Sequence, residues 1–142
     1  MNRLYGLIGF PLGHSFSARY FTEKFQRENL SGYEYRNFPL ESIRELPAML
    51  ENHPGLLGFN VTIPYKQEVI PFLTALSAEA REIGAVNCVK ITPQGLYGHN
   101  TDAYGFRKSL LGLIGPMRPD ALILGTGGAS KAVGISWGCS FR

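Results

Sequence analysis

The sequence predicts an α/β fold: a three-layer α/β/α sandwich around a mostly parallel sheet. Short apolar segments alternate with segments of helical periodicity along most of the 142 residues, a pattern typical of helices packed on both faces of a sheet. Two apolar segments, 85–91 and 96–100, are joined by Thr92-Pro93-Gln94-Gly95 and predict a hairpin. The composition, 44% hydrophobic and 18% charged, is that of a globular protein with a packed core.

The first half of the chain predicts three strands and two helices. Apolar residues that run together or alternate with polar ones predict strands at residues 3–10, 33–38 and 56–63. The first helix follows Ser15 and Ser17, and Ser17 is the better N-cap because the helical pattern follows it directly. The second helix is expected over residues 40–50, where Pro47 marks a new first turn or a kink.

The third of these strands ends at a proline and is followed by a lysine. Its buried residues are expected to be Leu56, Leu57, Phe59, Val61 and Ile63. Pro64 cannot extend the ladder, and residues 66–70 predict the start of a helix. Ligands of open α/β sheets bind at the carboxyl ends of strands, where Thr62 and Lys66 would lie. The helix dipole would favour a neutral amine. From this stretch alone, the alternative is an ordinary solvated lysine.

The second half predicts further helices and a domain boundary. Short helical pieces are expected over 69–76, a serine-capped helix over 77–83 that ends at Gly84, and a helix from 103 to about 113. Thr101 or Asp102 can cap this last helix. Residues 115–119 are rich in glycine and proline and predict a linker. We therefore expect one domain over 1–115 and a second that begins at 116 and includes 142.

The second segment begins like a dinucleotide-binding domain. Ala121-Leu122-Ile123-Leu124 predicts a buried strand that leads into a glycine turn and a helix start at Gly125-Thr126-Gly127-Gly128-Ala129. Ser130 stands where the third glycine of that motif is expected, so the motif alone is weak. Nine residues follow Val133 without a clear helical stripe. A second strand and its ribose-reading residue are therefore absent, and we expect the cofactor site to be incomplete.

Composition excludes several classes of function. No apolar run approaches the ~18 residues that span a bilayer, and no signal-peptide pattern follows Met1. Cys88 and Cys139 are too few for a disulfide framework, so a cytoplasmic location is expected. The net charge of +3 is scattered, which suits a small anionic ligand and gives no sign of nucleic-acid binding. The three histidines lack metal-ligand spacing.

Four polar stretches fall at the ends of predicted elements, and each has a structural alternative. Ser15 and Ser17 can hold a carboxylate or simply cap a helix. Asn87, inside an apolar strand, can bind a ligand or be a satisfied structural amide. Asp102 can cap a helix or face Lys66 across the carboxyl edge of the sheet. Such a pair could exchange a proton with an alcohol; a carboxylate favours charged lysine and burial favours neutral lysine, so the resting state stays open.

Five blocks of sequence, in order, resemble the shikimate dehydrogenase family. They are Gly9-Phe10-Pro11 with His14-Ser15-Phe16-Ser17; Gly58-Phe59-Asn60-Val61-Thr62-Ile63-Pro64-Tyr65-Lys66; Gly84-Ala85-Val86-Asn87-Cys88-Val89; Gly98-His99-Asn100-Thr101-Asp102 with Gly105-Phe106; and Leu124-Gly125-Thr126-Gly127-Gly128-Ala129-Ser130-Lys131-Ala132. Any one block is weak evidence, whereas the ordered set from residue 9 to 133 is highly specific.

The resemblance implies an activity and a role for each matching residue. The family reduces 3-dehydroshikimate reversibly to shikimate with NADPH, in the pathway to aromatic amino acids. By this resemblance Lys66 and Asp102 are the catalytic pair. The substrate carboxylate is bound by Ser15 and Ser17, and the ring hydroxyls by Thr62, Lys66, Asn87 and Asp102. The NADP pyrophosphate would bind at Gly125, Gly127, Gly128 and Ala129.

The sequence also departs from the family. Ala18 replaces a usual proline, Phe21-Thr22 a common His-Asn, and Cys88 a frequent threonine. From about Gly134 onward the resemblance ends, as an early frameshift or truncation would produce. We therefore expect very weak or no turnover from these 142 residues, and self-association through the strand 121–124 unless it folds back. The alternatives are a non-catalytic module that binds shikimate-like acids or pairs through its exposed strand, and a quinate or aminoshikimate relative.

Overall fold

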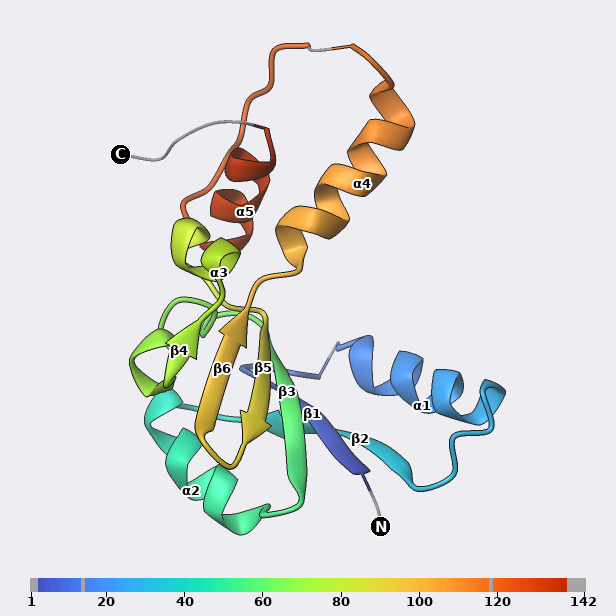
Figure 1. Cartoon of the computed structure of the whole chain (residues 1–142), viewed down its shortest axis with the longest axis vertical. Helices are drawn as coiled ribbons and strands as arrows, with labels where there is room; N and C mark the ends of the chain where they lie inside the picture. Colours follow the sequence, from blue (N-terminus) through green and yellow to red (C-terminus); the bar gives the residue numbers. More distant parts are fainter. Residues whose placement is uncertain (1–2, 14, 118, 138–142) are drawn as a thin grey trace.

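The computed structural model describes residues 3–13, 15–117 and 119–137, and in them one six-stranded sheet with the order β2-β1-β3-β5-β6-β4 (Figure 1). The strands are β1 Arg3–Gly9, β2 Tyr33–Pro39, β3 Leu56–Val61, β4 Ala75–Leu76, β5 Cys88–Thr92 and β6 Gly95–His99. β1 pairs in parallel with β2 and β3, and β4 with β6. Only β5 is antiparallel to its neighbours. The predicted mostly parallel sheet and its hairpin are confirmed.

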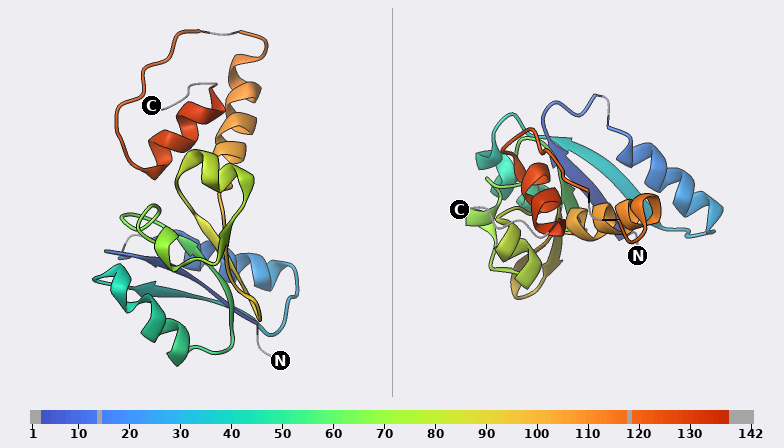
Figure 2. Two further views of the ribbon diagram at one scale, coloured as in Figure 1. Left: turned by 60° about the vertical axis from the view of Figure 1, so that its left-hand side comes forward. Right: turned by 90° about the horizontal axis from the view of Figure 1, so that it is seen from above.

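Helices cover both faces of this sheet. They are α1 Ser17–Arg27, the 3₁₀ helix η1 Ile43–Glu45, α2 Leu46–Asn52, the 3₁₀ helix η2 Ile70–Phe72, α3 Ala78–Ile83, α4 Asp102–Ile114 and α5 Gly128–Ser136. α1 and α2 lie on opposite sides of the sheet, while α4 and α5 stand together beyond its carboxyl edge (Figures 1 and 2). The three-layer α/β/α arrangement is therefore confirmed. No helix in the described ranges is long and apolar enough to cross a membrane.

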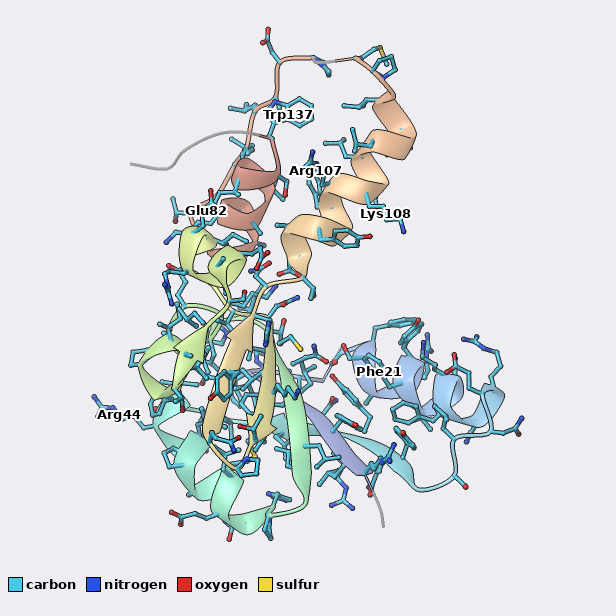
Figure 3. All side chains as sticks on the ribbon, in the orientation of Figure 1. Phe21, Arg44, Glu82, Arg107, Lys108 and Trp137 are labelled. Carbon is cyan, nitrogen blue, oxygen red and sulfur yellow. The ribbon has the colours of Figure 1, made fainter. Side chains whose placement is uncertain are left out.

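The alternation of side chains along β1 explains the three layers. Leu7 packs with Tyr35 and the apolar face of α1, whereas Ile8 packs with the core on the α2 side. Gly6 points to the same side as Ile8 and must be glycine, because a Cβ there would lie 2.3 Å from the Phe38 ring. On the other face, the Phe21 ring of α1 stacks on Tyr35 with centroids 4.5 Å apart (Figure 3).

Two features of the first half differ from the prediction. α1 has Phe16 rather than Ser17 as its N-cap, because Ser17 already adopts the helical conformation; Ser15 Oγ accepts a bond from Ser17 N at 3.4 Å. The helix predicted over 40–50 begins only at Ile43, as η1, and continues as α2 with Pro47 in its first turn. Pro47 therefore marks a new first turn, as predicted.

The third strand buries fewer residues than its apolar sequence suggests. Phe59 and Val61 are buried, but Leu57 is 42% exposed and Ile63 is 74% exposed. The register of β1 and β3 shifts at Leu4/Tyr5, so Leu57 is an extra residue on β3 and turns away from the core. Ile63 follows the end of the strand, which stops at Val61.

No helix begins at Lys66. Residues 64–69 form consecutive turns, η2 begins only at Ile70, and Ala75–Leu76 form the short strand β4 instead of helix. The Ile63-Pro64 peptide bond is cis. The predicted effect of a helix dipole on the Lys66 amine is therefore wrong. α3 confirms the next prediction, since Ser77 accepts from Ala80 N at 3.1 Å and Gly84 ends the helix with a positive φ of 67°.

The strand predicted at 121–124 is absent, and the helix after it is longer than expected. Residues 119–126 have no regular structure, and Leu122 and Leu124 are 84% and 86% exposed. A strand needs a partner, and the described residues supply none at this place. α5 begins at the predicted glycine turn and continues to Ser136, whose hydroxyl donates to Ala103 O at 2.9 Å. Packing against α3 and α4 therefore supports a helix that sequence periodicity does not indicate.

Candidate active site

An ion pair lies at the carboxyl edge of the sheet. Lys66 comes from the turns after β3, and Asp102 is the first residue of α4, directly after β6. Lys66 Nζ donates to Asp102 Oδ2 at 2.6 Å, with side-chain exposures of 18% and 32%. The predicted juxtaposition of these two residues is thus present. A half-buried ammonium that donates to a carboxylate can also donate to a ligand, because it has three N–H groups.

Asn87 holds the carboxylate of this pair. Its backbone is fixed between strands, since Asn87 N donates to His99 O and Asn87 O accepts from Val61 N. Its side-chain Nδ2 donates to Asp102 Oδ1 at 2.8 Å and to Thr101 Oγ1 at 2.9 Å, and its Oδ1 accepts from Thr101 N. Asn87 is therefore a satisfied amide that orients Asp102, and its binding of a ligand stays a prediction.

Thr101 is the N-cap residue of α4, one of the two predicted, but its side chain makes no capping bond, and the Asn100 side chain makes these bonds instead. The Asn100 side chain is buried, its Oδ1 accepts from Asp102 N at 3.0 Å and Ala103 N at 3.3 Å, and its Nδ2 donates to Ala85 O at 3.0 Å. Because Asn100 satisfies the first N–H groups of the helix, the Asp102 carboxylate is not needed as a cap. Asparagine two residues before the helix was the sequence signal for this cap.

A second group of predicted residues lines a cavity on the α1 side of the same edge. Ser15, Ser17 and Thr62 lie around a volume of about 430 Å³, whose other walls are apolar. The two loops that form it are joined by a bond from Phe10 N to Ile63 O at 3.1 Å. Paired hydroxyls in a largely apolar cavity suit the carboxylate of a small ligand.

Two residues that the prediction missed connect these groups. The Tyr35 hydroxyl donates to Asn60 Oδ1 at 2.8 Å, and Asn60 Nδ2 donates to Asn87 O at 3.3 Å. Burial raises the pKa of Tyr35 well above its usual range, Cys88 raises it further, and a hydrogen bond with Ser17 opposes both effects. Tyr35 therefore stays protonated at neutral pH. Asn60 lies in the second of the five blocks that resemble the family. Tyr35 lies outside these blocks, and only the alternation of a predicted strand applied to it.

The glycine turn lies against the ion pair. Gly127 is the N-cap of α5 without a side-chain cap bond, and Gly125 has a φ of +133° that other residues rarely adopt. A Cβ at Gly128 would stand 2.9 Å from Ala85 Cβ and 3.0 Å from Lys66 Cβ. Uncapped N–H groups at a helix start, approached by a bare backbone, fit a pyrophosphate. Ala129 belongs to this same first turn of α5.

One further bond ties α5 to the loop that carries Lys66. Lys131 Nζ, on α5, donates to Gln67 Oε1 at 2.7 Å, next to Lys66.

Cys88, beside Asn87, is a free thiol whose pKa is raised by burial. Within the described ranges, no group of three His, Cys, Asp or Glu side chains could hold a metal ion.

The fold and this edge define an α/β domain with a lysine–carboxylate pair beside a glycine turn. Residues 7–89 match the family model described as the shikimate dehydrogenase substrate binding domain. The chain belongs to this family. It is 42% identical, over 134 residues, to the NADP(+) shikimate dehydrogenase of Aquifex aeolicus, a match that covers 92% of this chain and 49% of that protein.

Solved structures of relatives agree with this assignment. The crystal structure of shikimate dehydrogenase from Aquifex aeolicus matches with a TM-score of 0.84 at 41% identity, over 96% of this chain and 52% of that one. The Thermus thermophilus shikimate 5-dehydrogenase in complex with NADP(H) and shikimate matches with a TM-score of 0.82 at 32% identity, also over 96% and 52%. The chain spans about half the length of the curated relatives it matches.

Proposed function

We propose that this chain binds shikimate and 3-dehydroshikimate and supplies the acid–base pair of an NADP-dependent shikimate dehydrogenase. The observation that carries the proposal is the Lys66–Asp102 pair at 2.6 Å, held by Asn87 at the carboxyl edge of the sheet. The family, and the shikimate named for the Thermus thermophilus relative, support this choice of ligand.

The proposed ligand would span the two groups of side chains. Its carboxylate would accept hydrogen bonds from Ser15 and Ser17, and Thr62 lines the same cavity close to the ring. The ring hydroxyls would reach Lys66, Asn87 and Asp102. Support comes from chemistry alone: hydroxyl donors face one end of the site, and an ammonium, an amide and a carboxylate face the other.

Lys66 would move the proton in the proposed reaction. Reduction adds a hydride to the carbonyl carbon and a proton to the carbonyl oxygen, and the Lys66 ammonium is the donor of that proton. In the oxidation of shikimate, the neutral amine accepts the hydroxyl proton as the hydride leaves. Asp102 would orient Lys66 and accept a hydrogen bond from the substrate, with its own position fixed by Asn87 and Asn100.

The glycine turn fits the pyrophosphate of NADP. Gly125, Gly127, Gly128 and Ala129 would hold it at the start of α5, where N–H groups and the helix dipole favour negative charge. When bound, NADPH supplies the hydride. Lys131 is hydrogen-bonded to Gln67, so α5 is tied to the loop that carries Lys66.

We also infer the domain division and self-association. α4 ends at Ile114, and Gly115 has a φ of +56°, which supports a boundary between 1–115 and 116–142. Leu122 and Leu124 are almost fully exposed, which supports pairing of this segment with a second copy. Light scattering that shows a monomer, unchanged by Leu122→Asp, would contradict self-association. Cytoplasmic location is proposed too, and recovery of the native protein outside the cytoplasmic fraction would contradict it.

Calorimetry with purified chain tests the proposed function. Shikimate should bind with one site per chain, and Lys66→Met should weaken binding, whereas Lys108→Met, on exposed helix α4, should not. Absence of shikimate binding by the wild-type chain would overturn the proposal. Binding of shikimate without NADP would favour the alternative, a non-catalytic module. Quinate in a parallel titration tests the substrate class, and robust NADPH oxidation with 3-dehydroshikimate would contradict the expected weak turnover.

A further inference from the structure

Tyr35 lies between the two halves of the site without belonging to either. Its hydroxyl donates to Asn60 Oδ1 at 2.8 Å. Asn60 Nδ2 donates to the backbone carbonyl of Asn87 at 3.3 Å, and the Asn87 side chain donates to Asp102. Tyr35 is thus joined through Asn60 to Asn87, the residue that holds the Lys66–Asp102 pair.

The direction of these bonds is fixed by Tyr35. A phenol has a single O–H, and here it is donated to Asn60 Oδ1. The amide of Asn60 has two orientations that differ in which end is the donor. Because Tyr35 supplies a donor, Oδ1 faces Tyr35 and Nδ2 faces Asn87 O, which is the orientation observed.

The ring of Tyr35 has little freedom to move. It is 8% exposed, stacks on Phe21 with an interplanar angle of 16°, and shares a core cluster with Leu7 and Leu12. Leu7 and Leu12 also line the cavity that contains Ser15, Ser17 and Thr62. The phenol therefore packs behind two residues of that cavity wall, and close packing sets the position of its hydroxyl.

We propose that Tyr35 is a positioning residue that, through Asn60, holds Asn87 and thereby the catalytic pair. The identity of the ligand rests on the proposed function; the coupling itself rests on the hydrogen bonds above. Tyr35 touches neither Lys66 nor Asp102 in these bonds, so it acts through Asn60 and Asn87.

Tyr35→Phe tests the coupling, because it removes the hydroxyl and keeps the ring. Tyr33→Phe is the matched control: Tyr33 lies on the same strand two residues away, and its hydroxyl accepts from Arg3 at an exposed site. Two measurements are made on each protein: shikimate affinity by calorimetry, and the side-chain NH₂ resonances of Asn60 and Asn87 by ¹H–¹⁵N spectroscopy. Thermal unfolding confirms that each variant is folded.

Tyr35→Phe should lower shikimate affinity about five- to tenfold, the worth of one hydrogen bond, and should shift the Asn60 and Asn87 amide signals; Tyr33→Phe should do neither. Wild-type affinity in Tyr35→Phe, or lost affinity with unmoved Asn87 signals, overturns the inference. If the wild-type chain binds no shikimate, the proposed function fails, and the ligand-free Asn87 signals still decide whether Tyr35 positions that residue.

Discussion

The backbone of Gly128 lies against the side chain of Lys66. A Cβ at position 128 would be 3.0 Å from Lys66 Cβ, closer than side chains normally approach, and 3.5 Å from Lys66 Cδ, an ordinary contact. The start of α5, where a pyrophosphate would bind, is thus in contact with the stem of the proposed acid–base residue. The proposed proton donor and the proposed pyrophosphate site would therefore share one packing interface. A substitution at Gly128 should then alter the position of Lys66, and a substitution at Lys66 should alter the start of α5.

Gly128→Ala should weaken shikimate binding several-fold and lower the unfolding free energy by about 1–3 kcal/mol, because an added methyl overpacks the contact with Lys66 and Ala85. Gly127→Ala is the control, since its Cβ meets open space and its φ of −76° suits alanine. Calorimetry and chemical denaturation measure both effects. Equal behaviour of the two variants would mean that the contact does not constrain Lys66.

Asn100→Ala should destabilise the protein by about 1–3 kcal/mol. The change removes the cap of α4 and leaves Ala85 O without its donor. It should also weaken shikimate binding, because Asp102 N loses its acceptor and the carboxylate loses its fixed position. Asn52→Ala, at the exposed end of α2, is the control and should change unfolding by less than about 0.5 kcal/mol. An unchanged unfolding midpoint in Asn100→Ala would show that the Asn100 side chain does not stabilise α4.

The sequence predicts most of this fold because local patterns and tertiary packing agree over β1, β2, α3 and the β5–β6 hairpin. It fails where packing decides the local structure. The bulge in β3 turns Leu57 outward, and the turns after Pro64 replace the expected helix at Lys66. At residues 121–124 an apolar sequence is not enough for a strand, since the ladder needs a partner.

The candidate site was predicted unevenly for a related reason. Lys66, Asn87 and Asp102 were identified because polar residues at the ends of apolar strands meet at one edge of a sheet. Tyr35 was missed because its role depends on Asn60, which is distant in the sequence. The bond from Asn100 to Ala85 O was missed for the same reason. Spacing along the chain does not reveal such bonds.

Lys66 and Asp102 should be coupled in binding and nearly neutral in stability. Because the pair is partly exposed, at 18% and 32%, Lys66→Met or Asp102→Asn should change the unfolding free energy by about 1 kcal/mol or less. Each should lower shikimate affinity at least about tenfold, since a charged donor or acceptor for the ring hydroxyls is lost. Lys108→Met, on the same helix as Asp102, is the charge-matched control.

A double-mutant cycle over Lys66→Met and Asp102→Asn measures the coupling directly. If the two residues act as one unit on the ligand, the double variant should bind little worse than the weaker single variant. Fully additive losses would show that Lys66 and Asp102 contact the ligand independently, and the proposed orientation of Lys66 by Asp102 would then be wrong.

Alkaline pH should destabilise the folded chain in two steps, one for Cys88 and one for buried tyrosine. Burial raises the pKa of the Cys88 thiol above its ordinary 9.0 and the pKa of the Tyr35 phenol above its ordinary 10.0. Between its unfolded and folded pKa values each group binds more protons in the folded state, so the unfolding free energy falls as pH rises. The contribution of these protonated groups to the unfolding free energy is complete below about pH 9 and is lost as the pH rises above it. Its slope is at most about 1.4 kcal/mol per pH unit for each group.

Denaturation curves from pH 8 to about 11 separate the steps by variant. Cys88→Ser should flatten the decline that begins near pH 9, whereas Tyr35→Phe should flatten only the part above pH 10. Tyr65, whose pKa is also raised by burial, keeps a residual slope in that upper window. Tyr104→Phe, at a residue 70% exposed, should follow the wild-type curve. If the wild type were equally stable across this range, Cys88 and Tyr35 would titrate as in the unfolded chain. Burial would then not raise the pKa of either group.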